Sequence, residues 1–237
     1  MAKKKKTAAE FDGIFVDKAE YGEKLEGFGR LKDNILFLIE NGKNKIVQVE
    51  SSVAGECKTT VIANLAVLLG MNEKKVLIID LDFLRAKSHI LFNVNNEKGL
   101  NEYMLGQAAL DEVVQSTQYK NVDLLPRGGK VANASLVLIS EKFHDTLKKF
   151  REEYDIVLID MSPVLQSANY LHVSPLTDAT LFLVAYGKTH RSQVREAIAE
   201  LKKSGANIVG AVYTMYDPKI GRSVGYKGNS YYDIFNS

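Results

Sequence analysis

The stretch KIVQVESSVAGECKTTVIANLAVLLGM, residues 45–71, runs from a strand pattern through a polar loop into a helical pattern. The first part, KIVQVE, reads as a short strand. After the loop, apolar residues recur at helical spacing, namely Val61, Leu65, Leu68 and Leu69. A strand that passes through a tight loop directly into a helix is the setting in which proteins bind phosphate groups.

The loop matches the phosphate-binding pattern G-x-x-x-x-G-K-[ST] only in part. Lys58 and Thr59 stand at the Lys and Thr positions, whereas Ser52 and Cys57 replace the two glycines. Such a site uses inward-pointing backbone N–H groups, a helix N-terminus, a lysine for the terminal phosphates and a hydroxyl for Mg²⁺. The loop alone is equally compatible with a plain helix start that is capped by a threonine.

The rest of the chain alternates between predicted strands and predicted helices. Further strands are expected at residues 74–80, 121–128, 154–160, 178–186 and 207–217, and helices at residues 23–40, 141–154 and 192–205. This alternation predicts an α/β fold with a mostly parallel central sheet and helices on both faces. We expect a flexible basic leader over residues 1–20, a single domain over residues 21–217 and a flexible tyrosine-containing tail over residues 218–237.

Two of the predicted strands end in carboxylates. Asp80 ends the strand LIID, and Asp160 ends the strand LID. In open α/β sheets, ligands bind at the carboxyl ends of the strands, so both residues should meet the end of the first strand at Glu50 and Ser51. An Asp at a strand end is often only a turn former. Two of them beside a Lys-Thr loop fit a metal–phosphate site better.

The composition sets limits on the function classes. The chain has 237 residues, of which 46% are hydrophobic and 25% charged, with a net charge of +2 and one cysteine. These values suit one compact domain, exclude a disulfide framework and a cysteine-based metal site, and argue against nucleic acid as a partner. The leader MAKKKKTAAE lacks the apolar stretch of a signal peptide, and its Lys3–Lys6 run is either a solvated leader or a contact for anionic lipid.

Three nucleotide motifs follow one another along the chain. SSVAGECKTTVIANLA is similar to a Walker A motif, VLIIDLDFLRAK to a Walker A′ motif and YDIVLIDMSPVL to a Walker B motif. In this order and with these flanks, residues 26–217 resemble the bacterial tyrosine kinases (BY-kinases) of capsule and exopolysaccharide synthesis, a branch of the MinD/ParA-like P-loop ATPases. The resemblance implies a P-loop NTPase-like fold and a split-type kinase subunit that a separate membrane protein activates.

The resemblance also implies roles for individual residues, with ATP and Mg²⁺ as cofactors. The nucleotide-binding residues would be Ala54, Gly55, Glu56, Cys57, Lys58, Thr59 and Thr60. Lys58 would hold the β- and γ-phosphates, and Thr59, Asp80 and Asp160 would place the metal. Lys58, Asp80 and Asp82 would be the catalytic residues, with the two aspartates accepting the proton of the tyrosine hydroxyl.

The tail and the partners follow from the same resemblance. Tyr226, Tyr231 and Tyr232 would be the phosphoacceptors. The expected partners are a membrane-anchored activator or chain-length regulator, further copies of this chain and a cognate tyrosine phosphatase, with no nucleic acid. The expected location is the cytoplasm, at the inner face of the membrane through the activator.

Several positions depart from the family pattern. Cys57 replaces a glycine, Leu84 stands where Walker A′ has an arginine, and Thr214 stands where an asparagine is usual. The family's subunit-contact helix has a glutamate followed by two arginines at three-residue spacing. Here these positions are Glu26, Gly29 and Lys32, so one arginine is lost and one is replaced by lysine. These departures keep a second hypothesis open, namely a catalytically impaired pseudokinase that acts as a scaffold of the polysaccharide assembly machinery.

The sequence gives less support to two other hypotheses, a MinD/ParA-like ATPase and a second phosphate site. A MinD/ParA-like ATPase would carry a signature lysine at the position of Val53. The segment YGKTH, residues 186–190, contains a Gly-Lys-Thr, but no glycine-rich loop precedes it. We therefore do not assign a phosphate site to that segment.

Overall fold

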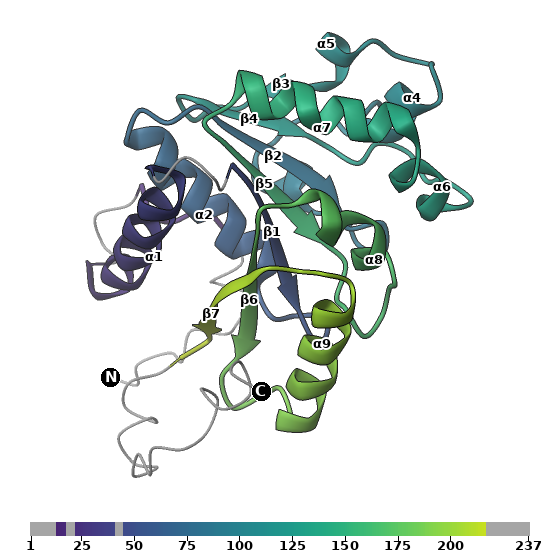
Figure 1. Ribbon diagram of the computed structural model, residues 1–237. Coiled ribbons are helices and arrows are strands. Elements are labelled where there is room, and N and C mark those ends of the chain that lie inside the picture. Colours follow the sequence, from purple (N-terminus) through teal and green to yellow (C-terminus); the bar gives the residue numbers. More distant parts are fainter. Residues whose placement is uncertain (1–12, 18–21, 41–44, 217–237) are drawn as a thin grey trace, which may run out of the picture.

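The computed structural model describes residues 13–17, 22–40 and 45–216. At its centre is a seven-stranded sheet in the order β3-β4-β2-β5-β1-β6-β7 (Figure 1). All neighbouring strands pair in parallel except β3 and β4, which are antiparallel. The strands are β1 (Ile46–Ser51), β2 (Val76–Leu81), β3 (Gln115–Ser116), β4 (Val122–Leu125), β5 (Ile156–Met161), β6 (Ala179–Ala185) and β7 (Ile208–Thr214).

Helices cover both faces of the sheet (Figure 1). The helices α1 (Gly22–Glu40) and α2 (Lys58–Met71) lie on one face, and α7 (Glu141–Glu153), α8 (Tyr170–Val173) and α9 (Arg191–Lys203) lie on the other. Short helices occupy the connections, namely α3 (Ser88–Leu91), α4 (Leu100–Met104), α5 (Leu110–Val113), α6 (Ala134–Leu138) and a 3₁₀ turn at Ser174–Leu176. This confirms the predicted α/β class with a mostly parallel sheet.

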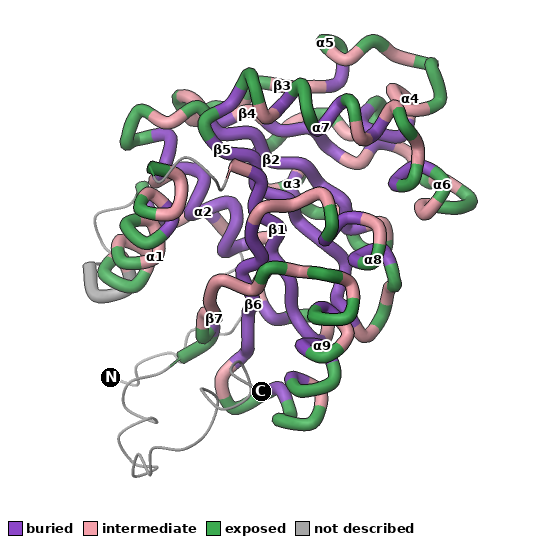
Figure 2. Tube along the Cα trace, viewed as in Figure 1, coloured by how far each residue is buried: buried purple, intermediate pink, exposed green. Residues whose placement is uncertain are grey.

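The central strands are buried along their whole length (Figure 2). Their side chains alternate between two cores, as the strand period requires. In β2, for example, Val76 and Ile78 pack on the side of α1 and α2, whereas Leu77 and Ile79 pack on the side of α7 and α9. The helix α2 is itself largely buried, so the segment that begins with the phosphate loop is held firmly.

The strand order, and not the chain order, brings the predicted motifs together. β5 lies between β1 and β2, although more than half of the described chain separates it from β1. Asp80 and Asp160 are register partners on β2 and β5. The carboxyl ends of these three strands are therefore neighbours at one edge of the sheet.

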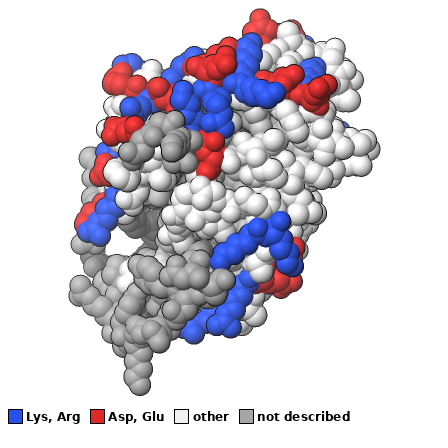
Figure 3. All heavy atoms as spheres, in the orientation of Figure 1, with Lys and Arg blue, Asp and Glu red and all other residues white. Residues whose placement is uncertain are grey.

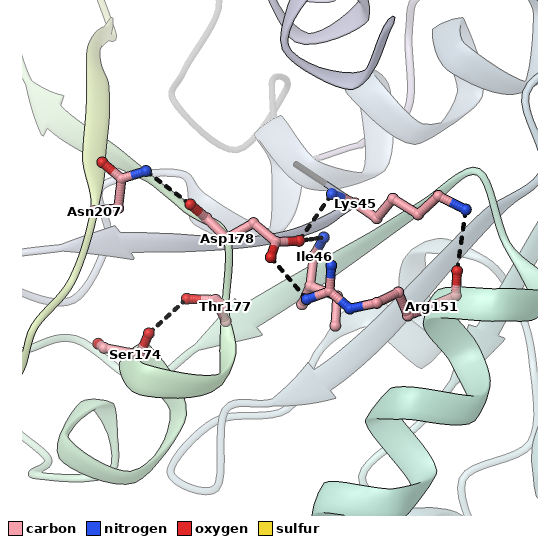
Figure 4. Close-up of polar contacts among 7 residues, drawn as sticks. All are labelled: Lys45, Ile46, Arg151, Ser174, Thr177, Asp178 and Asn207. Carbon is pink, nitrogen blue, oxygen red and sulfur yellow. Dashed lines mark hydrogen bonds and ion pairs between the residues drawn. The ribbon is translucent and has the colours of Figure 1, made fainter. Parts of the chain in front are cut away.

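The opposite edge, at the amino ends of β1 and β6, is joined by Asp178 (Figure 4). Its carboxylate accepts hydrogen bonds from the backbone N–H groups of Lys45 and Ile46 at 2.8 Å and from the guanidinium of Arg151 at 2.7 Å. Its carbonyl accepts a hydrogen bond from Asn207 at 2.8 Å. These bonds tie β1, β6, α7 and the start of β7 together at the amino ends of the strands. The predicted motifs lie at the opposite, carboxyl ends.

The sequence predicted the long elements but not the short ones. β3 is two residues long, and the helices α3 to α6 and α8 have four or five residues each, which is too short for a periodic pattern. Most of the predicted leader and tail lie outside the described residues, so the predicted domain boundaries stay a prediction.

On the face shown in Figure 3, Lys and Arg are interspersed with Asp and Glu along the edge of α7 and β3, and further cations lie over α9. Among the described residues, no helix has the length and apolar character needed to cross a membrane.

Candidate nucleotide site

The phosphate loop joins β1 to α2 and contains two residues with positive φ. Gly55 has a φ of +79°. Cys57, the residue before α2, has φ 65° and ψ 26°, in the left-handed region. This region costs an L-residue about 1–2 kcal/mol more than it costs glycine. The loop thus keeps the backbone angle for which the motif uses glycine, with a Cβ in place.

Lys58 opens α2 with its side chain almost fully buried. Its Nζ donates a hydrogen bond to Ser51 Oγ at 3.1 Å. Burial raises the pKa of both Glu50 and Asp160, and the ammonium of Lys58 opposes that shift in each. Lys58 is therefore the cation that offsets the carboxylates at this edge of the sheet.

Thr59 and Ser88 both face Asp160. The hydroxyl of Thr59 donates to Asp160 Oδ2 at 2.6 Å, and the hydroxyl of Ser88 donates to the same oxygen at 3.4 Å. The other oxygen, Asp160 Oδ1, is buried and has no hydrogen-bond partner in the part of the chain that the structure describes. A hydroxyl and a carboxylate oxygen with an available lone pair thus lie together where the sequence predicted a metal.

The segment after β2 folds back over its own aspartates. Asp80 accepts the backbone N–H of Asp82 at 3.1 Å and that of Ser88 at 3.2 Å. Asp82 Oδ1 accepts the hydroxyl of Ser162 at 2.8 Å, together with the backbone N–H groups of Leu84 and Arg85. The Walker A′-like and Walker B-like segments are therefore bonded to each other through Asp82.

The electrostatics of the site favour a cation. Burial and the neighbouring Asp160 raise the pKa of Asp80 to about 7. Burial raises the pKa of Asp160 to about 6, and it raises the pKa of Glu50 well above its ordinary value. Among the described residues, no three His, Cys, Asp or Glu side chains form a metal cluster. Mg²⁺ usually takes one or two carboxylates and completes its shell with water and substrate phosphates, so the donor set fits that ion.

The structure thus brings Lys58, Thr59, Asp80, Asp82 and Asp160 to one edge of the sheet. Ala54, Gly55, Glu56 and Cys57 form the loop above them, and Thr60 lies buried in the first turn of α2. Tyr226, Tyr231 and Tyr232 lie outside the described residues. Sequence reasoning missed Ser88 and Ser162, whose only signal is their proximity to the Walker A′-like and Walker B-like segments.

A family model described as an AAA domain matches residues 44–204. The chain belongs to this AAA domain family. The match includes the loop, both aspartate segments and the strands β1 to β6.

Individual relatives of this AAA domain are bacterial tyrosine kinases. Tyrosine-protein kinase YwqD of Bacillus subtilis is 29% identical over 187 residues, which cover 79% of each chain. The kinase domain of the Escherichia coli tyrosine kinase ETK superposes with a TM-score of 0.76 at 28% identity, covering 81% of this chain and 78% of the other. The chain spans 26% of the length of several longer curated tyrosine-protein kinases.

The septum site-determining protein MinD of Pyrococcus horikoshii, in complex with Mg-ADP, has a TM-score of 0.63 at 26% identity and covers 76% of both chains. Together these relatives confirm the resemblance to bacterial tyrosine kinases within the MinD-like P-loop ATPases. The roles of the individual site residues stay predictions.

Proposed function

We propose that this chain is an ATP- and Mg²⁺-dependent protein-tyrosine kinase that regulates bacterial polysaccharide synthesis. The observation that carries the proposal is the meeting of Lys58, Thr59 and Asp160 beside Asp80 and Asp82. The names of the relatives support the kinase activity, and the MinD structure with Mg-ADP supports the cofactors.

In this proposal, each residue of the loop edge has a separate task. Lys58, close to the ends of β1 and β5, neutralises the β- and γ-phosphates of ATP, and residues 54–60 contribute backbone N–H groups to them. Thr59 Oγ1 and Asp160 Oδ1 would hold Mg²⁺ directly or through water, because Thr59 Oγ1 is hydrogen-bonded to the Asp160 carboxylate and Oδ1 has no partner among the described residues. The bound ion supplies the charge neutralisation that phosphoryl transfer needs.

Asp80, near the end of β2, and Asp82, just after β2, differ in exposure, which separates their proposed tasks. Asp80 is fully buried, whereas Asp82 is 8% exposed. We assign metal placement to Asp80 and acceptance of the tyrosine proton to Asp82, because only the latter can be approached from outside. Its bonds to Ser162 and to the backbone of Leu84 fix the carboxylate for that approach.

The proposed phosphoacceptors are Tyr226, Tyr231 and Tyr232 of neighbouring copies of this chain. Each phosphate adds about −1.5 to −2 charges at neutral pH, which would drive a tail away from an acidic edge. A membrane-anchored chain-length regulator would activate the kinase and hold it at the inner face of the membrane, and a tyrosine phosphatase would reset it.

The test is incubation of the purified chain with radiolabelled ATP and Mg²⁺, with and without the cytoplasmic segment of such a regulator. We expect label on the three tail tyrosines, located by mass spectrometry. Lys58→Ala should reduce labelling by at least about 100-fold, since it removes the charge that faces the phosphates. Lys149→Ala, on the exposed side of α7, is the matched control and should label normally.

The negative results also have defined meanings. If neither the chain nor Cys57→Gly is labelled, and calorimetry detects no ADP binding, the kinase proposal is wrong and the pseudokinase scaffold is supported. If the chain binds and hydrolyses ATP without labelling any tyrosine, the MinD/ParA-like ATPase reading replaces it.

A further inference from the structure

Glu56 lies in the middle of the phosphate loop, and its side chain is turned into the protein. It is fully buried. Its Oε2 accepts the backbone N–H of Val53 at 2.8 Å, which closes the loop on itself. Its Oε1 accepts the backbone N–H of Ala185 at 3.0 Å and the hydroxyl of Thr189 at 2.5 Å. The carboxylate thereby joins the loop to the end of β6 and to the segment after it.

Backbone carbonyls of the loop are held from the same side. Lys188 Nζ donates to the carbonyl of Gly55 at 3.0 Å, and Thr214 Oγ1 donates to the carbonyl of Glu56 at 3.2 Å. In a planar trans peptide, the C=O of one residue and the N–H of the next point in opposite directions. Holding these carbonyls toward β6 and β7 therefore turns the N–H groups of Glu56 and Cys57 away from those strands.

The carboxyl group of Glu56 accepts hydrogen bonds at both of its oxygens. Two backbone N–H groups and one hydroxyl point at these two oxygens. A glutamine at this position would offer one accepting oxygen and would direct its own N–H₂ group at a donor. The site is thus specific for Glu.

We propose that Glu56 and Thr189 are positioning residues that hold the phosphate loop in its binding conformation before nucleotide arrives. The Gly-Lys-Thr segment of residues 187–189 then holds the phosphate loop in place and does not bind phosphate itself. We call this segment the clamp. The inference deepens the proposed function, since it rests on nucleotide binding at this loop. It concerns contacts within this chain that neither its family nor its relatives' names assign.

The test compares three substitutions of buried threonines. Thr189→Val removes the hydroxyl that bonds Glu56 and keeps the side-chain shape, and Thr189→Ser keeps the hydroxyl. Thr146→Val is the matched control, because Thr146 is equally buried but lies on α7, where its hydroxyl bonds Lys142 of the same helix. Each variant is measured by hydrogen–deuterium exchange without nucleotide, by titration with Mg-ADP and by thermal unfolding.

In the Thr189→Val variant, we expect the amide hydrogens of Val53 and Ala185 to exchange faster. We also expect the variant to bind Mg-ADP about tenfold more weakly, which corresponds to the loss of one hydrogen bond to a carboxyl group. In kinase assays the loss should fall on KM for ATP and not on kcat, because the bonded groups position the loop and do not touch the reacting atoms. Thr189→Ser should restore both readouts, and Thr146→Val should change neither beyond its effect on thermal unfolding.

The inference is overturned if Thr189→Val binds Mg-ADP within twofold of the unaltered chain and exchanges its loop amides at the same rate. It is also overturned if Thr146→Val weakens binding equally, since general destabilisation would then explain the loss. Failure of the proposed function looks different. The unaltered chain would then bind no Mg-ADP, while the exchange of Val53 would still report whether the clamp exists.

Discussion

Glu50, at the end of β1, and Glu56, in the loop that follows, are both fully buried, but their surroundings differ. Neither oxygen of Glu50 has a hydrogen-bond partner among the described residues. Both oxygens of Glu56 accept hydrogen bonds, from two backbone N–H groups and a hydroxyl. Burial raises the pKa of Glu50 well above its ordinary value of 4.5, and the ammonium of Lys58 only partly opposes this.

The difference shows two ways in which a protein can bury a carboxyl group. Hydrogen-bond donors of the protein can replace the lost water, as at Glu56, or the group can take up a proton, as the raised pKa of Glu50 indicates. Glu56 therefore stabilises the loop, whereas Glu50 destabilises the fold when it is ionised. We expect the same substitution, Glu to Gln, to have opposite signs at the two positions.

The largest effect is expected for Glu56→Gln. Its amide nitrogen would face a donor, so at least one buried N–H or O–H would lose its acceptor. We expect a loss of about 2–4 kcal/mol in the free energy of unfolding, measured by urea denaturation. Glu97→Gln makes the same change at an exposed position and should stay within about 0.5 kcal/mol of the unaltered chain. A loss of the same size at both positions would mean that the hydrogen bonds of Glu56 do not stabilise the fold.

The opposite sign is expected for Glu50→Gln, with a gain of about 1–3 kcal/mol at pH 8. The folded state of the unaltered chain binds the Glu50 proton more tightly than the unfolded state does. The stability of the unaltered chain therefore falls as pH rises from 4.5, the ordinary pKa of Glu50, toward its raised pKa in the folded state. The gain from the substitution should shrink toward pH 5. Urea denaturation at several pH values measures this, and a gain that does not depend on pH would contradict the assignment.

The sequence could predict one of these glutamates and its environment better than the other. The strand pattern placed Glu50 at a buried strand end beside Asp80 and Asp160, because apolar runs mark the strands and ligands bind at the carboxyl ends of parallel strands. The loop motif placed Glu56 only among the nucleotide-binding residues. Its partners Ala185 and Thr189 lie 129 and 133 positions away, and no local pattern connects them to the loop.

The same reason explains which parts of the site were recognised. Lys58, Thr59, Asp80 and Asp160 each belong to a short motif at the carboxyl end of a predicted strand, so their meeting was predictable. Ser88, which bonds both Asp80 and Asp160, lies in a four-residue helix that leaves no periodic signal. Lys188 and Thr189 belong to a recognisable Gly-Lys-Thr, but the sequence could only argue against a phosphate site there. It could not predict the contacts of these two residues with the phosphate loop.

A smaller gain, of about 1–2 kcal/mol at pH 8, is expected for Asp160→Asn. Burial raises the pKa of Asp160 from 3.8 to about 6, so the nucleotide-free fold loses stability as pH rises between these two values and keeps that loss at pH 8. An asparagine can keep the bonds from Thr59 and Ser88 on its oxygen and turn its N–H₂ group to the side on which the described residues offer no partner. Thermal unfolding should show the gain, and titration should show that Mg²⁺ no longer tightens ADP binding. If Mg²⁺ still does so, the metal does not depend on Asp160.

The smallest effect is expected for Cys57→Gly, with a gain of about 1 kcal/mol in the free energy of unfolding. Cys57 has a φ of 65°, where glycine is relaxed and a Cβ is not. Asn93, with a φ of 51°, is the matched control, because asparagine tolerates this region and Asn93→Gly should gain less.

Combining this change with Glu56→Gln tests whether the clamp is what keeps Cys57 in the left-handed region. If the clamp does so, the unclamped loop is free to leave that region, and Cys57→Gly should gain less in the Glu56→Gln background than in the unaltered chain. Equal gains in both backgrounds would mean that the contacts of Glu56 and the conformation of Cys57 are independent. The loop would then keep its shape through α2 alone.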